Sequence, residues 1–274
     1  MLRSNILLAA SVAGLVGLGD LSDRGPPGEI VELPHPFAPA LLSMPTRAFG
    51  AGARGLVIMV PDVVGQDGRA TPYVEALLAH GIATIEIDVG GDGPRHPGDV
   101  EAALAVARQQ VMGDARFRVL PIGVLGFGDG ARAALAWSGT VPVAALYPHC
   151  AAIPSLPVPE AVEDRAPLLL LHPATDATDR PGACARLVDA FGPGGFRHAY
   201  GDATPGWDIP PGGALTGPTL QPRDVPSYDG GAEALRYRAT YREGVTQDAA
   251  RRVAWFISAA IDRSGPWAPP SQVP

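Results

Sequence analysis

Short apolar runs and amphipathic stretches alternate along most of the chain. Residues 55–60 (GLVIMV) form a continuous apolar run, which is typical of a strand buried on both faces of a sheet. Residues 73–79 place apolar side chains at helical spacing, and this pattern stops at Gly81. The alternation continues and predicts further strands at 82–88, 119–125, 141–147, 167–172 and 196–200, with helices at 99–108, 129–137, 183–191 and 246–261.

This order of elements predicts an α/β fold, in which a mostly parallel sheet carries helices on both faces as a three-layer sandwich. Sheets of this kind bind ligands at the carboxyl ends of their strands, so each loop from a strand to the next helix is a candidate site. Residues 201–228 form a long loop rich in Gly and Pro. A loop of that length is usually functional or mobile.

The N-terminal residues 1–19 have the features of an export signal. Arg3 supplies the positive start, and residues 6–19 are an uncharged apolar run of signal-core length, short for a membrane span. Gly17 and Gly19 are small residues at the position of a cleavage site. The alternatives are a buried N-terminal helix and an uncleaved anchor. We therefore expect an exported protein, periplasmic or secreted.

The remaining boundaries follow from composition. Residues 20–54 are predicted as an N-terminal linker with an edge strand at 29–33, and residues 55–263 as the folded domain. Residues 264–274 are rich in Pro and are predicted to be a mobile tail.

Composition and charge narrow the function classes. The 274 residues are 46% hydrophobic and carry a net charge of −7, which argues against nucleic acid or an anionic membrane surface as the main partner. The sequence contains no Lys, so all 21 basic residues are Arg and a Schiff-base lysine mechanism is excluded. The two cysteines, Cys150 and Cys184, suggest one disulfide in an exported chain; in a reducing cytosol they would be two unrelated buried thiols.

Residues 125–130 (LGFGDG) lie between a predicted strand and a predicted helix, where a nucleophile elbow of the pattern G-x-S-x-G would stand. The flanking glycines suit the tight turn and close helix–strand packing. The centre of the pattern is Gly128, which has no side chain to attack a substrate. A dinucleotide-binding loop is disfavoured, because the spacing is not G-x-G-x-x-G and no acidic ribose partner follows at the expected distance.

From about residue 55 to residue 261 the chain resembles the dienelactone hydrolase-like branch of the α/β-hydrolases. The resemblance is carried by the segments IEIDVGGDGPRH, ALYPHC, PLLLLHPATDATDRPGACARL and YGDATPGWD, together with the elbow and the final helix. It implies the α/β-hydrolase fold and an ester- or lactone-cleaving triad. It places Asp176 at the acid position, and it favours a Cys150–Cys184 disulfide over a nucleophilic Cys150.

The departures from the family pattern affect the chemistry. The nucleophile position is Gly128, and the family's catalytic His falls on Pro205, so only Asp176 of the triad is retained. The resemblance puts the oxyanion donors at the backbone N–H groups of Asp129 and near Val63. The carboxylates of Asp62 and Asp129 would oppose an oxyanion there.

Other arrangements of these residues remain open. His149, with Asp176 or Asp129, is a candidate relocated base, and its alternative is a structural His. Asp62, Asp129, His149 and Asp176 could together bind a divalent cation. Their spacing matches no standard ligand motif, and acidic loop residues are usually solvated, so we predict no metal and no cofactor. By the resemblance Trp207 covers the vestigial cleft; the alternative is a loop anchor.

Three functions follow as hypotheses. The first is an exported, non-catalytic pseudo-enzyme that binds an unidentified small molecule or protein. The second is a divergent carboxylic-ester or lactone hydrolase that uses His149 or an activated water. The third is a structural envelope protein held near the membrane by residues 1–19.

Overall fold

The computed structural model describes residues 28–34, 37–45, 52–62, 66–88, 97–153, 156, 165–175, 179–211, 223–225, 235–237 and 239–262. The expected export signal at 1–19 and the expected tail at 264–274 lie outside these ranges. In the described part of the chain, no helix combines the length and the apolar character that a membrane span needs.

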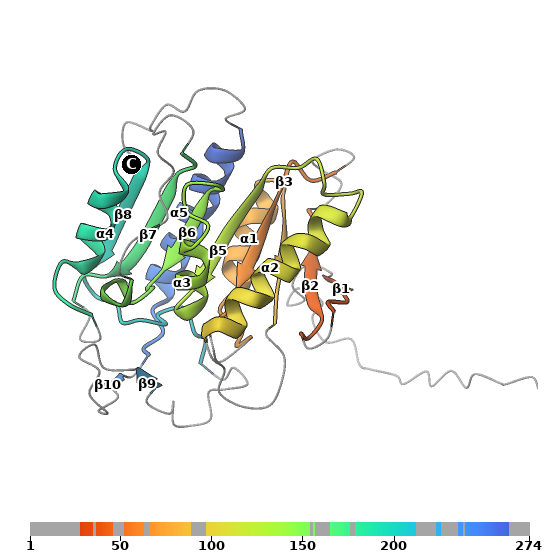
Figure 1. Cartoon of the computed structure of the whole chain (residues 1–274). Coiled ribbons are helices and arrows are strands. Elements are labelled where there is room, and N and C mark those ends of the chain that lie inside the picture. The colour runs from red at the N-terminus through yellow and green to blue at the C-terminus, as the bar shows by residue number, and fades with distance from the viewer. Residues whose placement is uncertain are drawn as a thin grey trace, which may run out of the picture.

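An eight-stranded sheet forms the centre of the molecule, with strand order β1-β2-β4-β3-β5-β6-β7-β8 (Figure 1). Strands β3 to β8 pair in parallel, while β1 and β2 join the edge beside β4 in antiparallel fashion. The strands are β1 (Gly28–Val31), β2 (Ala40–Ser43), β3 (Gly55–Val60), β4 (Ile82–Glu86), β5 (Ile122–Phe127), β6 (Val143–Leu146), β7 (Leu168–Pro173) and β8 (Gly195–Tyr200).

Helices cover both faces of this sheet, as the alternation predicts (Figure 1). The apolar side chains of β3 alternate between two cores: Leu56 and Ile58 face the core under α2, α3 and α4, whereas Val57 and Met59 face the core under α1 and α5. The helices are α1 (Thr71–Ala79), α2 (Pro97–Gly113), α3 (Asp129–Leu135), α4 (Ala183–Phe191) and α5 (Glu243–Ile261). The predicted fold class is confirmed.

Several predicted boundaries are wrong in detail. The strand expected at 119–125 is β5 and begins at Ile122, because residues before it form a turn in which Leu120 N–H donates to Phe117 O at 2.8 Å; Val119 is largely exposed. Strand β2 was not predicted. The loop expected at 201–228 contains β9 (Arg223–Val225), which pairs with β10 (Leu235–Tyr237) in a separate two-stranded sheet.

Cys150 and Cys184 form a disulfide, which confirms the predicted pairing. It joins the short 3-10 helix η3 (Cys150–Ala152), after β6, to the first turn of α4. A cross-link that closes a loop of this sequence separation, 34 residues, stabilises a folded chain by about 3–4 kcal/mol in the chain-entropy model. The disulfide therefore fixes the carboxyl end of β6 against α4.

Candidate functional site

The turn from β5 to α3 has the geometry of a nucleophile elbow. Gly128 lies between the two elements with φ 55° and ψ −117°, a conformation that side-chain-bearing residues rarely adopt. The neighbouring glycines allow a close approach: a Cβ on Gly126 would lie 2.5 Å from the Cα of Ala131, and one on Gly130 would lie 2.2 Å from the carbonyl oxygen of Pro61. The three glycines thus have steric reasons to be at these positions.

The space where an elbow side chain would start is filled by the Asp62 carboxylate. A Cβ built on Gly128 would lie 2.3 Å from Asp62 Oδ2 and 2.6 Å from Asp62 Cγ. Asp62 follows β3 and is buried, and its Oδ1 accepts a long hydrogen bond of 3.4 Å from the backbone N–H of Asp129. That N–H is the group that would face an oxyanion in an α/β-hydrolase. The Asp62 carboxylate therefore occupies the space that a nucleophile would need, and it also accepts a hydrogen bond from the N–H that would bind an oxyanion.

A buried arginine compensates the charge of Asp62. Nη1 of Arg69 lies 3.5 Å from Asp62 Oδ2, and the guanidinium also binds Asp67, with its Nε 2.8 Å from Asp67 Oδ1. All three side chains are nearly inaccessible to solvent. We call Asp62, Asp67 and Arg69 the buried ion cluster. The cluster contains two carboxylates and one cation, so its second negative charge depends on further polar neighbours for stabilisation.

Two tyrosines and Asp208 extend the ion cluster. Nη1 of Arg69 donates to the hydroxyl oxygen of Tyr147 at 3.1 Å, and this hydroxyl donates to Asp208 Oδ1 at 2.6 Å. The hydroxyl of Tyr73, from α1, donates to Asp208 Oδ2 at 2.8 Å. Burial raises the pKa of both hydroxyls well above the usual value, so they remain donors. Burial also raises the pKa of Asp208, and Arg69 and the two hydroxyls oppose this rise.

The loop after β8 closes over these groups. Trp207 is fully buried, with its ring 4.8 Å from that of Tyr147 and 5.2 Å from that of Tyr200, both edge-on. Pro205, at the family's His position, is buried in the same loop. The backbone carbonyl of Trp207 accepts hydrogen bonds from Arg242 N–H at 2.8 Å and from the hydroxyl of Thr246 at 3.2 Å. These contacts hold the loop against the start of α5.

A small cavity of about 10 Å³ lies beside the ion cluster, enough for about one water molecule. Asp67, Arg69, Phe127 and Glu86 are among the residues that line it. Burial, followed by the nearby charges of Asp67 and Asp88, raises the pKa of Glu86 from 4.5 to about 7. The cavity wall therefore contains a carboxyl group that titrates near neutral pH.

Replacing this carboxyl is expected to change the pH dependence of stability. Because the pKa of Glu86 is higher in the folded chain, the folded state binds the extra proton between pH 4.5 and about 7, and stability falls as pH rises through this window. We expect Glu86→Gln to be more stable than the wild type by about 2–3 kcal/mol at about pH 8 and to have a flatter profile. Urea unfolding at about pH 5 and pH 8 measures the difference. The exposed Glu75→Gln is the control, and equal profiles for the wild type and Glu86→Gln would contradict the prediction.

The structure brings together only some of the residues singled out in the sequence. Gly128, Asp62 and Asp129 are neighbours at the elbow, and Asp129 also accepts a 2.9 Å hydrogen bond from Arg132. His149 is buried just before η3 and has a left-handed backbone with φ 51°. Val63 and Asp176 lie outside the described residues, so their predicted roles stay predictions.

Sequence reasoning missed Arg69, Asp67, Tyr73 and Asp208. Their signal was weak, because Asp67 and Arg69 stand in a polar loop after β3 and Asp208 in a Gly- and Pro-rich loop, where polar residues are normally exposed. The one available clue was that two acids, Asp62 and Asp67, and then Arg69 follow a fully apolar strand. The carboxyl end of such a strand is where α/β sheets place their sites.

The sheet order, the covering helices and the elbow turn together define the α/β-hydrolase fold. No family model and no curated protein matches the sequence. Solved structures do match: the dienelactone hydrolase from Anabaena variabilis is 19% identical, with 70% of this chain and 93% of that chain covered and a TM-score of 0.52. The esterase domain of a Rhodothermus marinus protein is 16% identical, with 85% and 97% covered and a TM-score of 0.53.

A lidless α/β serine hydrolase from Xanthomonas campestris is 14% identical, with 65% of this chain and 85% of that chain covered and a TM-score of 0.51. At these identities the similarity shows the fold. The expected dienelactone hydrolase-like α/β-hydrolase fold is therefore confirmed.

Proposed function

We propose that this protein is an exported, non-catalytic α/β-hydrolase-fold protein that binds a small molecule or a protein and does not turn over esters or lactones. The observation that carries the proposal is the contact at the elbow: Gly128 offers no nucleophile, and the Asp62 carboxylate occupies the space where one would stand. Acyl transfer needs an attacking atom, a base to take its proton and donors for the oxyanion.

The electrostatics at the elbow support the proposal. A tetrahedral intermediate would bring negative charge next to Asp129 N–H, where Asp62 Oδ1 already lies at 3.4 Å. Arg69 pairs with the other oxygen of this carboxylate, Oδ2, at 3.5 Å. An oxyanion would have to displace a buried, paired carboxylate or share its donor, and like charges in a buried site repel strongly.

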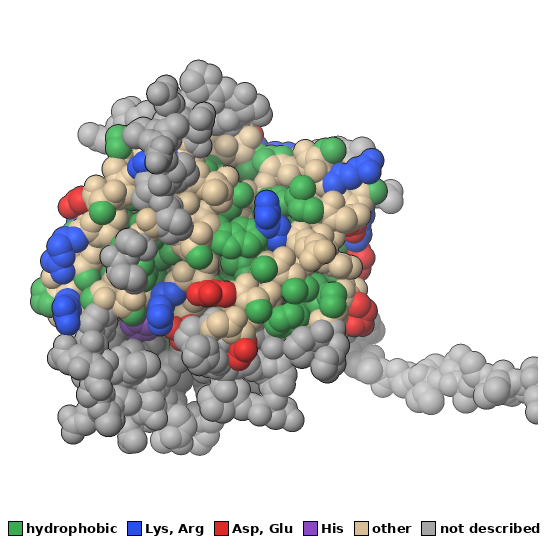
Figure 2. All heavy atoms as spheres, in the orientation of Figure 1, with side chains coloured by type: hydrophobic (Ala, Val, Ile, Leu, Met, Phe, Trp, Pro, Cys, Tyr) green, Lys and Arg blue, Asp and Glu red, His purple; other side chains and the backbone are tan. Residues whose placement is uncertain are grey.

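The distribution of charged side chains on the surface bears on the kind of partner that we propose. On the face covered by α2, α3 and α4, the described arginines are scattered among apolar and acidic side chains and do not form one continuous patch (Figure 2). This distribution suits a neutral or weakly charged partner better than a polyanion. The small-molecule alternative rests on the loops at the carboxyl ends of the strands.

We expect no turnover of p-nitrophenyl esters of short acids or of dienelactone above the rate in buffer. The reason is the missing nucleophile at Gly128 and the missing base at Pro205. A spectrophotometric assay of the purified protein measures this, with the same amount of heat-denatured protein as the control. The proposal would be overturned if the protein hydrolysed these esters or dienelactone and a substitution at the elbow site abolished that hydrolysis.

A divergent hydrolase is the second candidate, favoured by the backbone after β6. Tyr147 and His149 both have positive φ, 41° and 51°, although neither is glycine, and strained residues of this kind cluster at functional sites. If His149 acts as the base, turnover should decrease as pH falls below about 6.5, the ordinary His pKa, because the protonated ring cannot accept a proton. Turnover should also be lost in His149→Ala. Turnover that survives His149→Ala excludes this candidate.

Export is proposed from residues 1–19 and has its own test. We expect the protein in the soluble exported fraction, shortened by roughly the length of the signal. Cell fractionation with mass measurement of the N-terminus checks this. A full-length chain in the membrane fraction would favour the uncleaved anchor and the envelope-protein hypothesis instead.

A further inference from the structure

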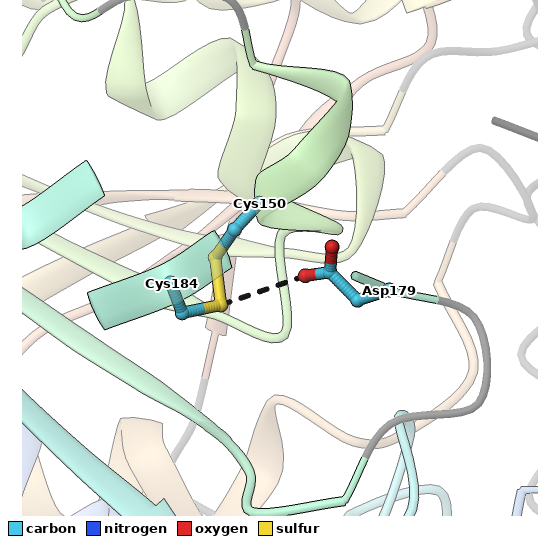
Figure 3. A group of neighbouring side chains, drawn as sticks. All are labelled: Cys150, Asp179 and Cys184. Carbon is cyan, nitrogen blue, oxygen red and sulfur yellow. Dashed lines mark hydrogen bonds between the residues drawn. A yellow bond between two sulfur atoms is a disulfide. The ribbon is translucent and has the colours of Figure 1, made fainter. Parts of the chain in front are cut away.

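Cys150, Cys184 and Asp179 converge at one place outside the elbow (Figure 3). Their two sulfur atoms and one carboxylate oxygen all lie within 4.8 Å of one another. Cys150 comes from η3, Cys184 from the first turn of α4, and Asp179 from the segment that leads into α4. Both cysteines are buried, and Asp179 is partly exposed, which leaves the group accessible from one side.

Once the disulfide is opened, the three side chains can reach the spacing of a tetrahedral zinc ion. Bond lengths of about 2.3 Å to sulfur and about 2.1 Å to oxygen, at tetrahedral angles, put two sulfurs about 3.8 Å apart and a sulfur and an oxygen about 3.6 Å apart. Asp179 Oδ2 lies 3.6 Å from Cys184 Sγ (Figure 3). The Cα atoms of the two cysteines are 5.0 Å apart, so small side-chain rotations would separate the reduced sulfurs.

The backbone positions Asp179 independently of the disulfide. Its Oδ1 accepts hydrogen bonds from the backbone N–H groups of Ala151 and Arg180, each at 2.8 Å. The other oxygen, Oδ2, lies toward Cys184 Sγ. Metal-binding carboxylates are commonly oriented in this way by outer hydrogen bonds. Cys184 stands in the first turn of α4, where the positive end of the helix dipole favours a thiolate.

We propose that the reduced protein binds zinc through Cys150, Cys184 and Asp179. A dithiol reductant opens the disulfide, is itself oxidised to a cyclic disulfide, and leaves two thiols; zinc then binds both thiolates and two protons are released. Two thiolates and a carboxylate are a donor set that suits zinc, and three protein ligands leave one position for water. Metal and disulfide exclude each other, so the site is controlled by redox state. The inference is independent of whether the elbow is catalytic.

Cobalt is the probe, because it replaces zinc in tetrahedral sites and has visible bands. The full chain is reduced, freed of reductant without oxygen, and titrated with Co²⁺. We expect thiolate-to-cobalt charge-transfer bands and tetrahedral d–d bands that saturate at about one cobalt per chain. Zinc should displace cobalt, since it binds such sites more tightly. The oxidised protein should give no band.

Variants identify the ligands. Cys150→Ser and Cys184→Ser should each abolish the charge-transfer band, and Asp179→Asn should raise the cobalt dissociation constant at least about 10-fold. Asp189→Asn, an exposed acid on α4, is the matched control and should bind as the wild type does. Equal binding by Asp179→Asn, or binding by the oxidised protein, would overturn the assignment.

The folding state of the reduced chain is followed by circular dichroism. Zinc should raise its melting temperature, because the metal binds the folded state. A reduced chain that neither gains stability with zinc nor binds cobalt would also overturn the proposal.

Discussion

The variant Arg69→Met is expected to lose about 3–5 kcal/mol of folding stability. Arg69 is the cation of the buried ion cluster, with Asp67 bound directly and Asp62 at 3.5 Å. Methionine fills a similar volume but removes the charge and the donors. The two carboxylates, and Asp208 behind Tyr147, would then lose the cation that the structure shows beside them, and loss of a partner costs far more for a buried charge than a surface ion pair gains.

The size of this loss should depend on pH. Arg69 opposes the rise in the pKa of Asp208, so removing Arg69 lets that pKa rise further. A folded state with a raised carboxyl pKa binds more protons than the unfolded state, so the variant regains stability as pH falls. We expect a larger difference from the wild type at about pH 8 than at about pH 5, measured by urea unfolding.

Two further variants make the Arg69 test specific. Arg251→Met removes an arginine whose side chain is 69% exposed, and it should change stability by less than about 0.5 kcal/mol. Asp67→Asn in the Arg69→Met background should recover part of the loss, because it removes one unpaired carboxylate. A loss for Arg69→Met that is independent of pH, with no recovery in the double variant, would contradict a charge-based account.

The elements of the fold could be predicted because their pattern is local. The run at 55–60 and the helix at 183–191 agree with β3 and α4 at both ends, since each has a clear apolar pattern and distinct flanking residues. Strand β2 was missed because Ala40–Ser43 is only four residues long and sits among prolines, so neither length nor alternation identifies it. Its place is set by pairing with β4, a tertiary contact.

Only those parts of the site that depend on a sequence motif or on a particular residue type could be predicted from the sequence. The glycine at the elbow and the disulfide could be read from the sequence, because both depend on particular residues. The Asp62 carboxylate meets the N–H of Asp129, which is 67 positions away, and lies beside Gly128; nothing local in the sequence specifies these contacts. The same holds for Tyr73 and Asp208, which meet from α1 and the loop after β8. Buried polar pairs of this kind are satisfied by tertiary structure alone.

Gly128→Ser is expected to cost about 3–5 kcal/mol, and Asp62→Ala should relieve part of this cost. A side chain at φ 55° is strained by about 1–2 kcal/mol, and its Cβ would displace the Asp62 carboxylate from Arg69 and from Asp129 N–H. The three atoms nearest to that Cβ all belong to Asp62. Removing this carboxylate therefore opens the space that the serine needs.

A double-mutant cycle measures the contact. The loss in Gly128→Ser/Asp62→Ala should be smaller than the sum of the two single losses by about 1–3 kcal/mol in urea unfolding. Asp67→Ala is the matched control, because it also removes a carboxylate from Arg69 but leaves the space beside Gly128 filled. Gly113→Ser controls for the serine itself, since a Cβ at Gly113 has no atom within 4 Å.

The same variants test whether the Asp62 carboxylate prevents catalysis at the elbow. Adding Pro205→His to Gly128→Ser/Asp62→Ala supplies a nucleophile and a base and frees the Asp129 N–H. If this triple variant hydrolyses p-nitrophenyl esters while Gly128→Ser/Pro205→His does not, the Asp62 carboxylate itself blocks catalysis at the elbow. If the cycle shows no coupling between positions 62 and 128, the carboxylate does not occupy the nucleophile's space in solution, and the main support for a non-catalytic function is removed.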